Sequence, residues 1–205
     1  LDRLTSPKDL LSRMRVLVRG NHLVWDIFGG EDSSGWDPDA DRMAQKLGQE
    51  LAQKVDLLHE AARLVTGPDA VSSTYDVGKG LASYARDMEN VWWILVGGFI
   101  SWRERERNPF ALKGYLEGVF ERDVRLSNKL LNEAVEKPEL RKHVPFLQSR
   151  FPLDDQGCGR LLVLMKQADV GAMSFLYVLN GQPGERSFDG SYPDYYAVKI
   201  LEGLL

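Results

Sequence analysis

Cysteine and histidine are scarce in this sequence of 205 residues, which has one cysteine and three histidines. Because Cys158 has no second cysteine to pair with, no internal disulfide can hold the fold, and the composition is typical of a reducing, cytoplasmic environment. His22, His59 and His143 are far apart and stand in no H-E-x-x-H or Cys-x-x-Cys context. We therefore expect no metal ion and no other cofactor.

Long hydrophobic runs and a large excess of one charge are also missing. The longest apolar stretch, residues 91–102, has about 12 residues, whereas a helix that spans a bilayer needs roughly 20. No signal or transit peptide is visible. The net charge of −4 and the pI of about 5.5 indicate a surface that is not built to neutralise phosphates. We expect no membrane partner, and nucleic acid is disfavoured as a partner.

Three long segments with apolar residues at helical spacing fill the middle of the chain. The first begins at Asp37-Pro38, an N-cap acid and a proline that suits the first helical position, and continues to Gly67-Pro68. The second follows Gly78-Lys79-Gly80 and the third covers residues 109–137. Apolar residues recur along each at steps of three and four. The pattern predicts an all-α multihelical bundle with three long central helices and shorter flanking helices, or an α-solenoid-like stack of the same helices.

The second segment is apolar all round over residues 91–102, so we expect it to be the central helix of the core, covered on both sides. Gly97-Gly98 inside it would cost about 1 kcal/mol each relative to alanine, which indicates a close helix crossing or a kink. Asp123 falls on the apolar stripe of the third segment. One interpretation is that Asp123 is an acid with a shifted pKa in a cleft. The interpretation that we favour is structural: Asp123 either forms an ion pair, for which an arginine of residues 103–107 is the candidate partner, or marks a helix break near residue 122.

Shorter helices are expected on either side of the central three. Residues 1–30 should hold an N-terminal helix, and residues 138–205 a region of short helices that includes 155–167, 169–180 and a last helix after Pro193. Strand is the competing interpretation for residues 160–165 and 175–179, because short apolar runs are ambiguous. We expect residues 1–205 to form a single all-α domain. Leu1 at the start and an amphipathic pattern that continues to Leu205 indicate a piece of a larger protein.

Two polar loops carry aromatic residues that could bind a partner. Residues 181–193 form a loop of about 13 residues, longer than the usual helix connection, with Phe188 and Tyr192 in it and Tyr195 just after it. Trp36 lies in the other loop. Aromatic loops on a rigid scaffold are common recognition surfaces, and the alternative is that these rings fold back over a neighbouring helix.

One pair of residues has the composition of a nuclease site. Arg15 is followed seven positions later by His22, with Asn21 adjacent to the histidine. This spacing resembles the arginine-x(4 to 6)-histidine signature of the HEPN family, small all-α domains that often act as metal-independent ribonucleases. The resemblance implies that His22 acts on the 2′-hydroxyl or the leaving group, while Arg15 stabilises the charge of the phosphorane.

The sequence as a whole favours a non-catalytic helical module that binds a protein partner, or other domains of the same parent chain, inside the cell. Stacked helices provide extended binding surfaces without catalytic residues. The first alternative is a HEPN-like ribonuclease that uses Arg15 and His22. The second is a sensor domain that binds a small ligand in a pocket made by aromatic residues and one acid, namely Trp92, Trp93, Trp102, Tyr115 and Asp123.

Overall fold

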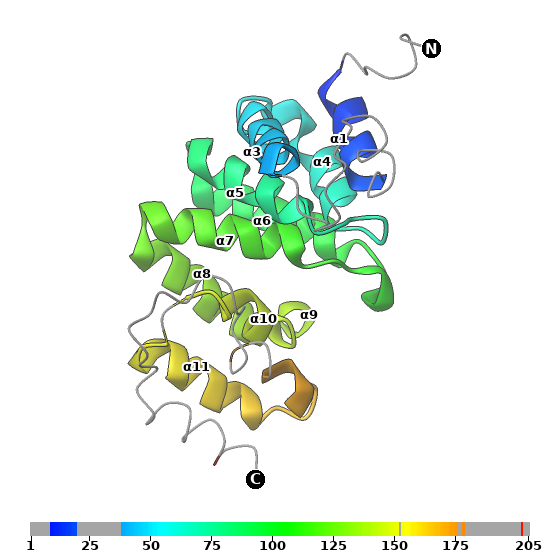
Figure 1. The fold of residues 1–205 in the computed structure, drawn as a ribbon. Helices are drawn as coiled ribbons and strands as arrows, with labels where there is room; N and C mark the ends of the chain where they lie inside the picture. Colours follow the sequence, from blue (N-terminus) through cyan, green and yellow to red (C-terminus); the bar gives the residue numbers. More distant parts are fainter. Residues whose placement is uncertain (1–8, 20–37, 152, 176–177, 179–201, 203–205) are drawn as a thin grey trace. The chain divides into compact units, whose positions relative to one another are not determined.

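The protein is all-α. A computed structural model describes residues 9–19, 38–151, 153–175, 178 and 202, and these residues form α-helices and short 3₁₀ helices without any β-strand (Figure 1). The helical class predicted from the apolar periodicity is confirmed. The chain divides into two compact units, residues 1–127 and 128–205, with the boundary inside helix α8 (Val124–Glu136).

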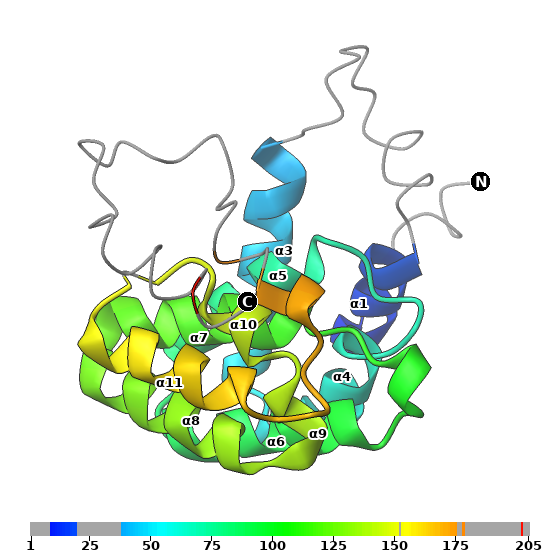
Figure 2. The ribbon, with the colours of Figure 1, turned by 90° about the horizontal axis from the view of Figure 1, so that it is seen from below.

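Alternate helices pack against each other in the first unit. Helix α3 contacts α5, α5 contacts α7, and α4 contacts α6 (Figures 1 and 2). The unit is made of α1 (Leu10–Arg19), α3 (Pro38–Ala52), α4 (Leu58–Val65), α5 (Thr74–Tyr84), α6 (Met88–Ile100), α7 (Phe110–Arg122), the start of α8 (Val124–Glu136), and two 3₁₀ helices, Val55–Leu57 and Glu104–Glu106. Helices that neighbour each other in sequence therefore lie in different rows.

Glycines bring α5 very close to both of its neighbours. A Cβ atom added to Gly78 would lie 2.1 Å from the carbonyl oxygen of Ala111 in α7, and one added to Gly80 would lie 2.0 Å from that of Gln45 in α3. Because a side chain at either position would collide with backbone, the three helices can pack this tightly only around glycine. The glycines that we expected before the second helix thus lie inside α5, where they serve helix packing.

Each of the three predicted long helices is interrupted, so the predicted lengths are wrong. The first segment divides into α3 and α4 around Val55–Leu57, the second into α5 and α6, and the third into α7 and α8. Two of the breaks are made by aspartates that cap the following helix. The carboxylate of Asp87 accepts the amide N–H of Asn90 at 3.0 Å, and that of Asp123 accepts the N–H of Leu126 at 2.9 Å. An N-cap aspartate starts a new helix at the same place where the apolar spacing continues unbroken.

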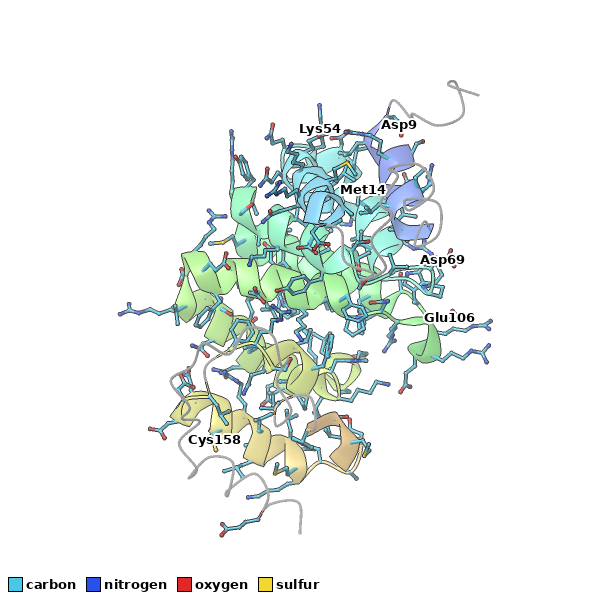
Figure 3. All side chains as sticks on the ribbon, in the orientation of Figure 1. Asp9, Met14, Lys54, Asp69, Glu106 and Cys158 are labelled. Carbon is cyan, nitrogen blue, oxygen red and sulfur yellow. The ribbon has the colours of Figure 1, made fainter. Side chains whose placement is uncertain are left out.

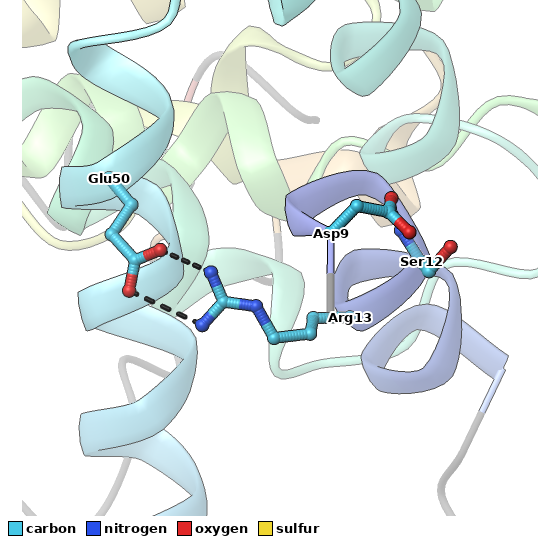
Figure 4. A network of polar contacts seen from close by, with 4 residues as sticks. All are labelled: Asp9, Ser12, Arg13 and Glu50. Atoms are coloured by element: carbon cyan, nitrogen blue, oxygen red, sulfur yellow. Dashed lines mark hydrogen bonds and ion pairs between the residues drawn. The ribbon is translucent and has the colours of Figure 1, made fainter. Parts of the chain in front are cut away.

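Helix α1 is attached to α3 and α4 by a small apolar face and two surface ion pairs. Met14 is fully buried and projects toward these helices (Figure 3). Arg13 forms a two-point ion pair with Glu50 of α3, while Asp9 accepts the N–H of Ser12 at 2.9 Å and caps α1 (Figure 4). Hydrogen bonds from Ser12 lower the pKa of Asp9. Exposed pairs of this kind stabilise weakly, so the buried apolar face holds α1 in place.

The second unit contains the rest of α8, α9 (Pro138–Arg141), α10 (Val144–Gln148), α11 (Asp155–Met165) and the 3₁₀ helix Ala172–Phe175. The helix predicted at 155–167 is confirmed, and the strand alternative for residues 160–165 is wrong. Of the helix predicted at 169–180, the described residues show the short 3₁₀ helix and helical backbone at Val178. No helix in the described part of the chain is long and apolar enough to cross a membrane.

Candidate functional site

Helix α6 has one uncovered face, although it is the most apolar of the described helices. We expected it to be covered on both sides, whereas exposed Gly97 and Ile100 leave one side open. Trp93 is half-buried, Gly97 is exposed, and Ile100 keeps 41% of its surface exposed. These residues are spaced i, i+4 and i+7, so they lie along one face of the helix. Exposed Asn90 and Ser101 flank them. We call the surface of Trp93, Gly97 and Ile100 the α6 face.

The opposite side of α6 is packed against α7. The ring of Trp92 stacks on that of Tyr115 with centroids 6.3 Å apart and an interplanar angle of 22°, and both side chains are fully buried. The phenol of Tyr115 donates a hydrogen bond to the carbonyl oxygen of Met88 at 2.7 Å. Burial strongly raises the pKa of this phenol, which therefore remains a neutral donor. The contact fixes the rotation of α6 about its axis.

The two glycines of α6 have different surroundings. A Cβ atom added to Gly98 would lie 2.7 Å from the carbonyl carbon of Ala62 in α4, so Gly98 is at a helix crossing, as the sequence predicts. A Cβ atom added to Gly97 would meet no atom within 4 Å. Gly97 therefore leaves a shallow gap on the α6 face, between Trp93 one turn before it and Ile100 one turn after it.

The predicted aromatic pocket does not assemble as one site. Trp92, Trp93 and Tyr115 come together, with the two tryptophan rings edge to face at 6.3 Å. Trp102 is bound elsewhere, because its Nε1 donates to the carbonyl oxygen of Arg63 at 2.9 Å and the Arg63 guanidinium lies 5.5 Å from its ring centroid. Nε1 of the fully buried Trp92 has no hydrogen-bond partner within the described ranges.

Asp123 lies outside this cluster and faces solvent rather than the core. Helix α7 ends at Arg122, and Asp123 caps α8, which agrees with the favoured interpretation of a helix break. Arg107, one of the arginines that we considered as its partner, is used differently. Arg107 donates to the carbonyl oxygens of Trp102 at 3.0 Å and Ile100 at 3.3 Å, and so it satisfies the C-terminal end of α6. This contact holds Ile100 in place on the α6 face.

Of the two residues in the predicted ribonuclease site, the structure describes Arg15 but not His22. Arg15 forms an ion pair with Glu60 of α4, and both side chains are about half exposed, at 46% and 53%. His22 lies outside the described residues. An arginine that already binds a carboxylate would have to leave that partner before it could stabilise a phosphorane.

The predicted binding loops also fall outside the described residues, and this applies to Trp36, Phe188, Tyr192 and Tyr195. Among the residues that the structure describes, no group of three or more histidine, cysteine, aspartate or glutamate side chains could hold a metal ion. Cys158 is 3% exposed on α11.

A charged cluster between α5 and α7 was not predicted from the sequence. The ammonium group of Lys79 lies 3.0 Å from a carboxylate oxygen of Glu117 and 2.8 Å from one of Glu121, and the phenol of Tyr75 donates to Glu117. Burial lowers the pKa of Lys79, but its contacts with Glu121 and Glu117 outweigh this effect and leave the pKa raised. The i, i+4 spacing of the two glutamates was visible in the sequence, whereas the position of Lys79 opposite them depends on helix packing.

Comparison of the chain with protein-family models, with curated proteins and with solved structures gives no significant match. The function therefore has to be inferred from the residues of this chain.

Proposed function

We propose that this protein is a non-catalytic helical module that binds a protein partner through the α6 face. The observation that supports the proposal is the exposure of Gly97 and Ile100 on a helix whose opposite side is apolar and packed. A tryptophan and an isoleucine beside a gap, with Asn90 and Ser101 at the edge, have the composition of a protein interface, which has an apolar centre and a polar rim.

The stacking of alternate helices in the first unit adds support. Helical arrays in which α3, α5 and α7 form one row and α4 and α6 another present long, rigid surfaces of the kind used in α-solenoid proteins. Both ends of the α6 face are fixed, one by the Trp92 and Tyr115 stack and the other by Arg107. A rigid surface loses little conformational entropy on binding, which favours affinity.

The test is affinity capture from lysate with the full 205-residue chain, followed by quantitative mass spectrometry of the retained proteins. Two variants alter the α6 face. Ile100→Glu places a charge on it, and Gly97→Gln fills the gap at a position where a new Cβ atom meets nothing within 4 Å. We expect one stoichiometric partner with the parent chain and its loss with both variants.

The matched control is Val124→Glu. Val124 is an aliphatic residue at the start of α8 with a similar exposure of 49%, and the substitution changes the net charge by the same amount as Ile100→Glu. Equal retention of the same proteins by the parent chain and all three variants would contradict the proposal. Loss of the partner from Val124→Glu as well as from Ile100→Glu would show a nonspecific charge effect and would also contradict it.

A further inference from the structure

The second unit contains a buried cation whose hydrogen-bond partners are all neutral. Arg160 of α11 is 7% exposed. Its Nε donates to Oε1 of Gln148 at 2.8 Å, and its Nη1 donates to Oδ1 of Asn128 at 2.9 Å and to Oδ1 of Asn132 at 3.0 Å. None of these partners carries a charge. In the described part of the chain, Arg160 forms no ion pair with a carboxylate.

Asp154, the acid whose charge acts on this cation, is not one of its hydrogen-bond partners. Oδ1 of Asp154 accepts the amide N–H of Gly157 at 2.7 Å and so caps α11. Burial lowers the pKa of Arg160, and the charge of Asp154 acts against this effect from a distance. Guanidinium groups keep their proton in proteins, so the second unit contains a full positive charge that is held in place but not neutralised by contact.

The orientation of the asparagine amides follows from the chemistry of arginine. A guanidinium has only donors, so Asn128 and Asn132 must both turn their oxygen toward it and their NH₂ group away. Gln148 uses its own NH₂ group on the carbonyl oxygen of Gly157, at 3.0 Å. Over the described ranges, no acceptor is bound to Nη2 of Arg160 or to the NH₂ groups of Asn128 and Asn132.

We propose that Arg160, Asn128 and Asn132 bind an oxyanion, either a carboxylate or a phosphate group. The cluster has a positive charge and a surplus of donors, which is the chemistry that an anionic oxygen requires. Asn132 is exposed and Asn128 is half-buried, so the cluster can be reached from solvent. The two asparagines are spaced i, i+4 on α8, and Gln148 holds the guanidinium from α10, so the donors are positioned before a ligand arrives.

This site lies in the second unit, and its role goes beyond the proposed binding of a protein through α6. A purely structural link between α8, α10 and α11 would also use the three observed hydrogen bonds. It gives no reason for a permanent charge at this position, because a neutral side chain can make similar bonds to amides. The charge of Asp154 weakens anion binding, so we expect a dissociation constant on the order of 1 mM for a free ion.

The first test is a titration of the ¹⁵N-labelled full-length chain followed by NMR. Inorganic phosphate and acetate are the two probes, and chloride keeps the ionic strength constant. We expect saturable shifts of the NH₂ resonances of Asn128 and Asn132 and of the Nε–H resonance of Arg160. A response to phosphate alone supports the site and indicates a phosphorylated ligand, and a response to acetate alone supports it and indicates a carboxylate. No saturable shift with either probe would overturn the proposal.

The second test is the isosteric variant Asn132→Asp. The new carboxylate still accepts a hydrogen bond from Arg160, so we expect the fold to be retained. The substitution neutralises the positive charge of Arg160 and removes the two N–H donors of the Asn132 amide. We expect binding of the active probe to weaken at least about tenfold, which corresponds to the loss of one charge-assisted contact. Gln53→Glu, at an exposed position just after α3 in the first unit, changes the net charge equally and should bind the probe as the parent does. Equal affinity of Asn132→Asp and the parent chain would refute the site.

Discussion

Gly97 and Gly98 are neighbours in one helix, and we expect alanine at these two positions to change stability in opposite directions. Both are inside α6, so each substitution gains the same helix propensity, about 1 kcal/mol. At Gly97 the new methyl group meets no atom within 4 Å. Gly97→Ala should therefore raise the free energy of unfolding by about 1 kcal/mol.

At Gly98 the methyl group meets α4. It would lie 2.7 Å from the carbonyl carbon of Ala62 and 2.9 Å from both its Cβ and its oxygen, well inside the contact distance of about 3.5 to 4.0 Å. Overpacking of this kind costs about 1 to 3 kcal/mol, because the backbone of α4 has to move. After the propensity gain, Gly98→Ala should lower stability by about 0 to 2 kcal/mol.

The difference between the two variants isolates the packing cost, since the propensity gain cancels. We expect this difference to be about 1 to 3 kcal/mol. The assay is urea unfolding followed by tryptophan fluorescence, which reports on Trp92 and Trp93 of the same helix. If the two variants shifted the midpoint equally at an unchanged m-value, the packing of α6 against α4 as described would be refuted.

Three further predictions concern the charged cluster, a helix cap and the aromatic loop. Lys79→Met should lower the free energy of unfolding by about 1 to 3 kcal/mol, because it removes the ammonium group that pairs with both Glu117 and Glu121. Since the folded pKa of Lys79 is raised above 10.5, its contribution is complete below that pH and declines as the pH rises through the folded value. The difference in free energy of unfolding between the parent chain and Lys79→Met, measured by urea unfolding, should therefore become smaller in strong alkali. A difference that stays constant with pH would contradict this role of Lys79. Asp123→Ala should cost about 0.5 to 2 kcal/mol through loss of the α8 cap, whereas Asp123→Asn should preserve most of the stability in the same assay. The double change of Phe188 and Tyr192 to alanine tests the loop predicted from the sequence. Loss of the captured partner would place part of the interface there, and its full retention would rule the loop out as a binding surface.

The HEPN alternative has a direct assay as well. If Arg15 and His22 formed a ribonuclease site, His22→Ala would abolish RNA cleavage while the fold remained intact. The protein-binding proposal expects no cleavage above background from the parent chain in the first place. RNA cleavage by the parent and its loss in His22→Ala would favour the enzyme.

The helical class could be predicted because it depends on local periodicity. Apolar residues at steps of three and four along residues 38–137 specify a helix wherever they occur. The same periodicity hides the breaks at Asp87 and Asp123. A cap interrupts the backbone for only a residue or two, and the apolar spacing on either side remains compatible with one continuous helix.

The functional surfaces could not be predicted in the same way, because each depends on which helix lies opposite. Gly97 and Gly98 have the same residue type in the same helix, and only the position of Ala62 in α4 gives them different roles. Arg160, Asn128 and Asn132 can be read directly from the sequence, but their proximity cannot. Asn128 is 32 residues and Asn132 is 28 residues away from the arginine along the chain, and nothing local links them to it before α8 and α11 pack together.

By itself, then, the sequence determined that this protein is helical, lacks disulfides and has an acidic surface, because these properties follow from residue type and spacing. Only the tertiary structure decided which face of α6 stays open, which glycines allow helices to meet, and which cation is buried without a counter-charge. Those features depend on distances between segments far apart in the chain, and packing alone sets these distances.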